Sequence, residues 1–157
     1  MISYSRDCVI DNNSLPQSLE GIIAGRFDMS SDNLTLSRNT IKTLRFGEEL
    51  NEKAGIQVST KNNLIIDNFV ADSQNGILVT GTNNTISGNV LVNNDVGARL
   101  EGNYNNVTGN SFIYNGQNGL QEKSRFAPPN ANLDNNTWDG NFWAAYFGQP
   151  SSSYDLP

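Results

Sequence analysis

The sequence contains no histidine, one cysteine and two methionines, and these shortages exclude several kinds of chemistry. Without histidine, a Ser-His-Asp triad or a Cys-His pair cannot form. A copper or structural zinc site would lack the imidazole and sulfur ligands that it needs. Cys8 cannot form an intramolecular disulfide, and we expect it to be a small buried hydrophobic residue. We therefore predict no metal site built on these ligands.

Basic residues and long apolar runs are also scarce. Ten lysines and arginines against sixteen acidic residues give a net charge of −6, which opposes the phosphate neutralisation that drives nucleic-acid binding. No run approaches the roughly 18 apolar residues of a membrane span, and the first six residues lack the features of a secretory signal. We expect neither nucleic acid nor membrane insertion. Because the chain goes almost directly into repeats, we interpret it as part of a longer exported chain that continues at the N-terminal end.

What the sequence does contain is a repeat of 21 residues. Gly-Ile-Gln-Val at 55–58, Gly-Ile-Leu-Val at 76–79 and Gly-Ala-Arg-Leu at 97–100 share this spacing, and Gly119-Leu120 follows 22 residues after Gly97. An independent column has the same period, with an aliphatic residue three positions before each asparagine. Its members are Ile65 with Asn68, Ile86 with Asn89, and Val107 with Asn110. Weaker copies, Val9 with Asn12, Leu36 with Asn39 and Leu133 with Asn136, extend the count to about six units.

Each unit resembles three short strands separated by turn residues rather than a helical repeat. This pattern predicts an all-β fold, a right-handed parallel β-helix of about six coils. Like residues stack in successive coils at about 4.8 Å, so each inward position becomes an apolar column. Four such columns are predicted: Ile56, Ile77, Ala98 and Leu120; Val58, Val79 and Leu100; Leu36, Ile65, Ile86, Val107 and Leu133; Ile41, Val70, Leu91, Phe112 and Trp138.

The recurring asparagines and glycines have structural explanations. Asparagine tolerates the left-handed conformation of tight turns, and its amide can hydrogen-bond along a stack. The glycines are expected at strand entries, where a Cβ would crowd or φ is positive. We predict one asparagine ladder of Asn39, Asn68, Asn89, Asn110 and Asn136.

Two insertions interrupt the period and mark loops where function can be added to a solenoid. They lie at about 42–54 and 122–131. We predict a single β-helix domain over 1–148 and a C-terminal tail over 149–157. An aromatic-rich segment, about 137–148, is expected to cap the open end of the solenoid, although clustered aromatics can also stack on sugars.

Both insertions border the strand that begins with the repeated glycine. Outward positions on that face are predicted to form a polar, charged strip of Gln57, Arg99, Glu101 and Gln121, interrupted by Leu78. These four polar residues are the candidate ligand-binding residues. Glu101 with Arg99, Lys123 or Arg125 could act as the acid and base of a lyase or epimerase, but opposite charges on neighbouring strand positions are also common without any catalytic role.

We predict no cofactor. Calcium is the one metal that the oxygen ligands would suit, through Asp67, Asp72, Asp95 and Asp134, but these residues lack the spacing of calcium-binding β-rolls.

The coil Asn75–Asn89 and the downstream motif Trp138-Asp139-Gly140-Asn141-Phe142-Trp143 resemble the NosD-like right-handed β-helix family. The resemblance covers roughly residues 55–148. It implies a fold related to carbohydrate-binding and sugar-hydrolase β-helices, and an extracellular, cell-surface or periplasmic location. The family takes its name from copper-enzyme maturation. Enzymatic relatives carry an Asp-Pro-His-Asp motif that this chain lacks, so the resemblance assigns no catalytic residue.

Three functions follow from these patterns. The first is an exported or surface module that contacts polysaccharide or glycan along one strand face without catalysis. The second is a lyase, epimerase or hydrolase acting on an acidic polysaccharide. The third is a structural spacer or adhesin segment that binds nothing small.

Overall fold

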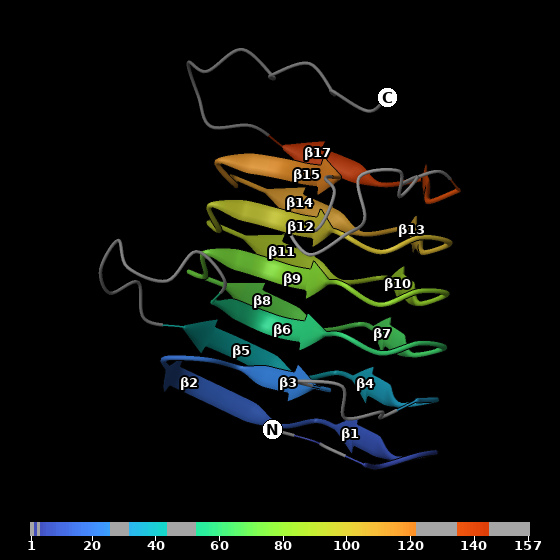
Figure 1. Cartoon of the computed structure of the whole chain (residues 1–157). Helices are drawn as coiled ribbons and strands as arrows, with labels where there is room; N and C mark the ends of the chain where they lie inside the picture. Colours follow the sequence, from blue (N-terminus) through green and yellow to red (C-terminus); the bar gives the residue numbers. More distant parts are fainter. Residues whose placement is uncertain (1, 3, 26–31, 44–52, 122–134, 145–157) are drawn as a thin grey trace.

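The described part of the chain is a stack of parallel coils (Figure 1). The computed structural model describes residues 2, 4–25, 32–43, 53–121 and 135–144. These residues include no helix, hence none that could span a membrane, and their strands form three parallel sheets of six, six and five strands. Successive coils add one strand to each sheet in turn. The prediction of a right-handed parallel β-helix is therefore confirmed.

We name the three sheets A, B and C. Sheet B contains β1 (Val9–Asp11), β4 (Thr35–Ser37), β7 (Leu64–Ile66), β10 (Thr85–Ser87), β13 (Asn106–Thr108) and β16 (Thr137–Asp139). Sheet C contains β2 (Ser14–Ser18), β5 (Thr40–Thr43), β8 (Phe69–Ala71), β11 (Val90–Val92), β14 (Ser111–Ile113) and β17 (Phe142–Ala144). Sheet A contains β3 (Ile22–Ala24), β6 (Ala54–Val58), β9 (Asn75–Val79), β12 (Val96–Leu100) and β15 (Gln117–Gln121).

Stacked apolar columns form the core, as the repeat predicts. Each inward strand position meets its equivalent in the next coil, so Ile65 pairs with Ile86 and Ile86 with Val107. Burial is complete along the middle of these columns. The sheet B column is Ile10, Leu36, Ile65, Ile86, Val107 and Trp138, and the sheet C column is Leu15, Ile41, Val70, Leu91, Phe112 and Trp143.

The last coil differs from the prediction in register. Trp138, rather than Leu133, stacks on Val107, and Trp143, rather than Trp138, stacks on Phe112. Asn110 donates its backbone N–H to Asn141 Oδ1 at 2.9 Å, across 31 residues. The spacing between the fifth and sixth coils is therefore 31 residues, ten more than the 21-residue period. The stacked positions belong to Trp138 and Asn141 and not to the predicted pair, Leu133 and Asn136.

The segment predicted as a cap begins with the last two strands. β16 and β17 complete two sides of a sixth coil, and their tryptophans end the apolar columns. In the first insertion, Lys42 and Thr43 belong to β5 and Ala54 begins β6. Residues 44–52 of that insertion, the second insertion and residues 145–157 lie outside the described residues.

Three asparagine ladders, rather than one, hold the corners of the coils. Asn68 shows the bonding pattern: its backbone N and its Nδ2 both donate to Asn89 Oδ1, at 2.9 and 3.0 Å, and its Nδ2 also donates to Leu36 O at 2.8 Å. The ladder between sheets B and C is Asn13, Asn39, Asn68, Asn89, Asn110 and Asn141. The ladder between sheets A and B is Asn63, Asn84, Asn105 and Asn136, and that between sheets C and A is Ser73, Asn94 and Asn115.

The predicted membership of Asn136 in the first ladder is thus wrong, because Asn136 belongs to the second. The left-handed conformation also lies one residue earlier than predicted. Asp67, Asn83 and Asn93 have φ of 55°, 56° and 53°, and each directly precedes a buried asparagine. Short polar side chains accept this conformation at low cost. The turn residue bends the chain from one sheet into the next, and the asparagine that follows bonds that turn to the neighbouring coil.

Glycine is required where coils approach most closely. A Cβ on Gly55 would lie 2.2 Å from Val70 Cγ1, and one on Gly97 would lie 2.6 Å from Phe112 Cδ1. Crowding, rather than positive φ, explains this column. Gly119 is not its fourth member, since Gly119 pairs with Ala98 in the neighbouring coil.

Gly81→Ala should therefore destabilise the fold. Its Cβ would lie 1.8 Å from the backbone oxygen of Thr60, which cannot move without shifting the preceding coil. We expect a loss of about 1 to 3 kcal/mol in the free energy of unfolding, measured by urea titration. Thr82→Ala, at an exposed position one residue beyond, should change it by less than about 0.5 kcal/mol. Equal effects of the two changes would mean that the close approach at Gly81 is absent.

Candidate functional site

The outer face of sheet A carries the predicted strip, with one change of register. Its central outward column is Ile23, Gln57, Leu78, Arg99 and Leu120. Leu120 was predicted to point inward and Gln121 to join this column. Instead Gln121 pairs with Leu100, and Trp138 Nε1 donates to Gln121 Oε1 at 3.4 Å.

The reason for the change lies at the corner before β15. Asn94 Nδ2 donates to Asn115 Oδ1 at 3.0 Å, 21 residues further on, so the coil keeps the regular period. Gly97 is therefore aligned with Asn118. The Gly119-Leu120 pair, 22 residues after Gly97, is not the fourth copy of the glycine strand in this register. The asparagine spacing was the signal in the sequence that could have corrected this register.

The strip is largely buried rather than an open polar surface. Leu78 is only 2% exposed and Ile23 only 6%. Gln57 is half-buried and lies two strands from Arg99, with Leu78 between them. At about 4.8 Å per strand, Gln57 and Arg99 are roughly 10 Å apart at the backbone. Gln57 and Arg99 therefore share a face without being neighbours.

Arg99 and Glu101 are brought together at the end of β12. Alternate residues of a strand point to the same side, so positions 99 and 101 lie next to each other on one face. Arg99 Nη2 donates to Glu101 Oε1 at 2.7 Å, and the two side chains are 21% and 10% exposed. Removing two charges from water to this extent is costly, and the short charge-assisted bond offsets part of that cost.

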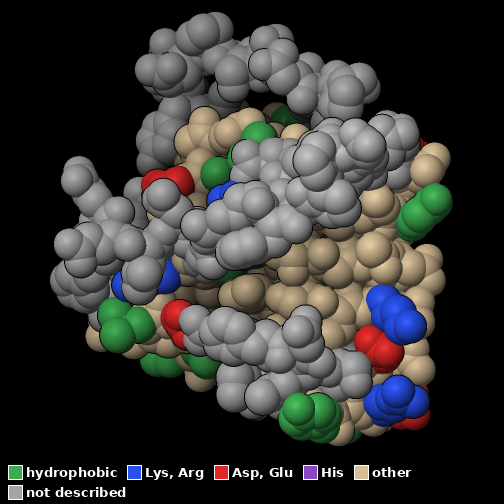
Figure 2. All heavy atoms as spheres, viewed as in Figure 1, with side chains coloured by type: hydrophobic (Ala, Val, Ile, Leu, Met, Phe, Trp, Pro, Cys, Tyr) green, Lys and Arg blue, Asp and Glu red, His purple; other side chains and the backbone are tan. Residues whose placement is uncertain are grey.

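Two of the predicted residues, Lys123 and Arg125, lie outside the described residues. Sheet B presents a different outer surface, mainly of hydroxyl and amide side chains such as Thr85, Ser87 and Asn106. In the view of Figure 2, uncharged polar side chains and backbone make up most of the described surface. The half-buried ion pair on sheet A therefore stands out as the candidate site.

The aspartates predicted as calcium ligands do not form a cluster. Asp67, Asp72 and Asp95 occupy separate turns, and Asn93 Nδ2 donates to Asp72 Oδ1 at 2.7 Å. Across the described residues, no three His, Cys, Asp or Glu side chains come close enough to hold a metal ion. Asp134 lies outside the described residues.

A scan against protein-family models matches residues 1–148 to the family described as periplasmic copper-binding protein (NosD). The chain belongs to the NosD family. Searches of curated proteins and of solved structures found no match. Membership agrees with the parallel β-helix of the structure and with the exported location expected from the sequence, since the family is described as periplasmic.

The residues of this NosD chain do not fit the copper site that the family description implies. The whole sequence has no histidine, and its only cysteine is Cys8. The prediction that Cys8 is buried is wrong: the thiol is exposed and donates to Arg6 O at 3.2 Å. Both methionines, Met1 and Met29, lie outside the described residues. The soft and imidazole ligands that copper prefers are thus too few among the described side chains to surround an ion.

Proposed function

We propose that this chain is a non-catalytic β-helix module of an exported protein and that it contacts polysaccharide along the outer face of sheet A. The Arg99–Glu101 pair carries the proposal, because it is a largely buried pair of opposite charges, far less exposed than the pair of Arg38 with Asp11. A guanidinium donor beside a carboxylate acceptor suits a ligand that offers both hydroxyl and carboxylate groups. Acidic polysaccharide has that chemistry.

The β-helix supports such contact through its rigidity. β12 is paired on both sides, with β9 and β15, so Arg99 is held on a central strand. Glu101 directly follows that strand, and its backbone N donates to Val79 O at 2.8 Å. A ligand would bind without the cost of ordering backbone, which favours affinity.

A lyase or epimerase is the second candidate, and the same ion pair favours it. Abstraction of a proton next to a uronate carboxylate needs a base and a cation that stabilises the developing charge. A uronate carboxylate that took over the Arg99 donors would release Glu101 to act as that base. Binding without catalysis is the preferred hypothesis because Arg99 and Glu101 are bonded to each other in this structure, so Glu101 is not available as a base.

The experiment is a screen of the purified chain against neutral and acidic polysaccharides, recording retention and ultraviolet-absorbing unsaturated products. We expect retention on an acidic polymer without product. Formation of product would replace the module with the enzyme. If the screen finds neither retention nor product, both hypotheses are refuted and the spacer hypothesis remains.

Arg99→Gln should weaken retention on the acidic polymer about tenfold or more. A charge-assisted hydrogen bond contributes about 1.5 to 3 kcal/mol, and 1.4 kcal/mol corresponds to a factor of ten. Arg38→Gln is the matched control, since Arg38 forms a more exposed pair with Asp11 at the end of sheet B. Circular dichroism should show both variants folded. Equal retention of the Arg99 variant and the wild type would mean that the outer face of sheet A does not bind the polymer.

A further inference from the structure

Tyr104 is an aromatic residue in a backbone conformation that suits small polar residues. It lies in the turn that connects β12 to β13, and its φ is 59°. The left-handed region brings Cβ close to the following carbonyl oxygen, so bulky side chains adopt it at a cost. Backbone strain of this kind is concentrated at functional sites. The position of Tyr104 therefore calls for an explanation beyond the fold.

The equivalent turns have asparagine at this position. Backbone hydrogen bonds between successive turns align positions 62, 83 and 104 in one column. Asn62 and Asn83 have φ of 60° and 56°, and Asn83 Nδ2 donates to Asn62 Oδ1 at 2.6 Å. Asn33 and Asn135 also have positive φ, two residues before β4 and β16. From β4 to β16, the residue two positions before each sheet B strand is thus asparagine except before β13, where it is Tyr104.

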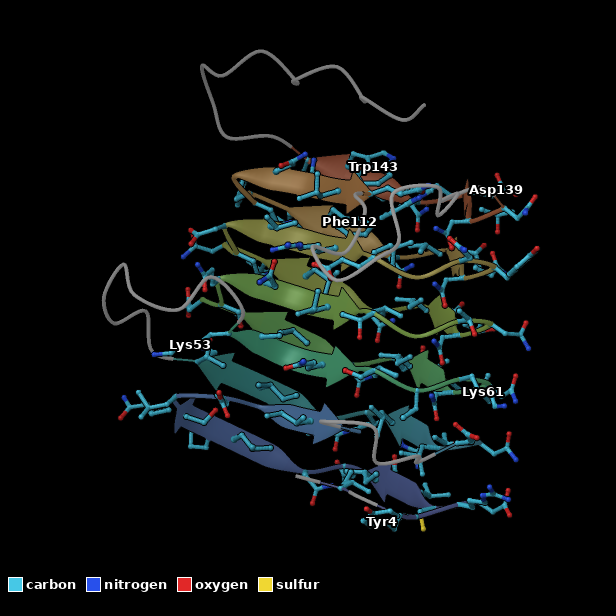
Figure 3. The ribbon with its side chains drawn as sticks, viewed as in Figure 1. Tyr4, Lys53, Lys61, Phe112, Asp139 and Trp143 are labelled. Carbon is cyan, nitrogen blue, oxygen red and sulfur yellow. The ribbon has the colours of Figure 1, made fainter. Side chains whose placement is uncertain are left out.

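Tyr104 is exposed and lies in the same turn as Glu101. The tyrosine is 61% exposed. Glu101 begins the turn directly after β12, and three residues span at most about 11 Å at about 3.6 Å per residue, so the two Cα atoms are no further apart than that. The labelled Lys61 in Figure 3 lies in the corresponding turn between β6 and β7 and marks this edge of the molecule. The turn after β12 therefore combines one partner of the ion pair with an exposed aromatic ring.

An exposed ring supplies what the ion pair lacks as a site for sugars. A sugar ring has hydroxyl groups around its edge and C–H groups on its faces. Arg99 and Glu101 suit hydroxyl and carboxylate groups, but Leu78, the apolar neighbour of Arg99, is only 2% exposed. Tyrosine offers a flat apolar face and loses little conformational freedom when it is covered. The strained turn thus presents an apolar surface close to a polar one.

We propose that Tyr104 is a stacking site for a sugar ring of the bound polysaccharide, beside the Arg99–Glu101 pair. The inference rests on the proposed function and deepens it. One sugar residue would place its carboxylate or hydroxyl groups on the ion pair, and a nearby residue of the same polymer would lay its ring face on Tyr104. The polymer would then cross the edge between sheets A and B instead of running along the axis of the solenoid.

Tyr104→Asn tests the stacking, because asparagine is the residue that the neighbouring turns have. It should weaken retention on the acidic polymer about fivefold or more. Tyr104→Phe, which keeps the ring, should restore most of that retention. The matched control is Tyr114→Asn, since Tyr114 also has a left-handed backbone, with φ of 54°, but lies at the other end of the sheet A strands, before β15. The control should be retained like the wild type.

Urea unfolding separates a loss of binding from a loss of structure. Both asparagine variants should unfold at the urea concentration of the wild type or higher, because Asn83 and Asn93 have the same backbone conformation at the equivalent positions. Unfolding of Tyr104→Asn at a lower concentration would mean that the ring supports the fold, and the inference would be wrong.

The retention measurements distinguish this inference from the proposed function. If Arg99→Gln weakens retention but Tyr104→Asn does not, stacking on Tyr104 is refuted while the proposed function stands. Equal weakening by the two asparagine variants, or a phenylalanine variant as weak as the asparagine one, also refutes stacking. If no polysaccharide retains the wild type, the proposed function fails and the stacking site fails with it.

Discussion

Asn89→Ala is expected to lower the free energy of unfolding by about 3 to 5 kcal/mol, because the change leaves several buried groups without partners. Asn89 Oδ1 accepts from both the N and the Nδ2 of Asn68, and Asn89 Nδ2 donates to Ile65 O and to Asn110 Oδ1. Alanine supplies none of these side-chain contacts. Urea unfolding followed by circular dichroism measures the loss.

Asn106→Ala is the control for this prediction. Asn106 is exposed on sheet B, and its Oδ1 accepts one bond, from Thr137 Oγ1 at 2.7 Å. We expect a loss of less than about 1 kcal/mol, since water can replace that partner. If Asn89→Ala were as mild as Asn106→Ala, the ladders would be a consequence of stacking and not one of its causes.

Phe112→Ala should cost about 3 to 5 kcal/mol, as a fully buried large-to-small change. Phe112 stacks on Trp143, both labelled in Figure 3, with ring centroids 4.4 Å apart and an interplanar angle of 15°. The Trp138 ring is tilted relative to Phe112, with centroids 6.3 Å apart. Removal of the ring opens a cavity beneath both tryptophans. Tryptophan fluorescence during urea unfolding should therefore report both the lower stability and the changed surroundings of the indoles.

Phe142→Ala provides a matched aromatic control in the neighbouring strand. Phe142 is 60% exposed and points to the outer side of sheet C, next to Ser111. Its truncation should lower the free energy of unfolding by about 1 kcal/mol or less. A similar loss for Phe142 and Phe112 would contradict the assignment of inward and outward positions in β14 and β17.

The middle coils could be predicted from the sequence because two independent columns share one period there. Ile65, Ile86 and Val107 stack as predicted, and so do Asn68, Asn89 and Asn110. Two further ladders were visible at the same spacing in Asn63, Asn84 and Asn105 and in Asn94 and Asn115. They were missed because asparagine is frequent in every turn of this chain.

The last coil could not be placed from the local pattern alone. Leu133 with Asn136 and Trp138 with Asn141 both present an apolar residue three positions before an asparagine. Only the hydrogen bond from Asn110 to Asn141 and the pairing of Val107 with Trp138 decide between them. A period predicts which residues stack within regular coils, but it does not predict the length of an insertion.

The candidate site was predicted in part. Spacing by two residues on a strand correctly places Arg99 beside Glu101. Their burial could not be predicted, because it depends on neighbours that are distant in sequence. Leu78, between Gln57 and Arg99, is likewise only 2% exposed although it lies in the outward column.

Mapping of the ligand by NMR tests the central proposal most directly. Amide shifts of the labelled chain would be followed during titration with short fragments of the polysaccharide that retains it best. We predict that the largest changes lie in β9, β12 and β15, around Arg99 and Glu101, and that Arg99→Gln abolishes them. Changes confined to sheet B or sheet C, or none at saturating fragment, would contradict the assignment of polysaccharide binding to this face.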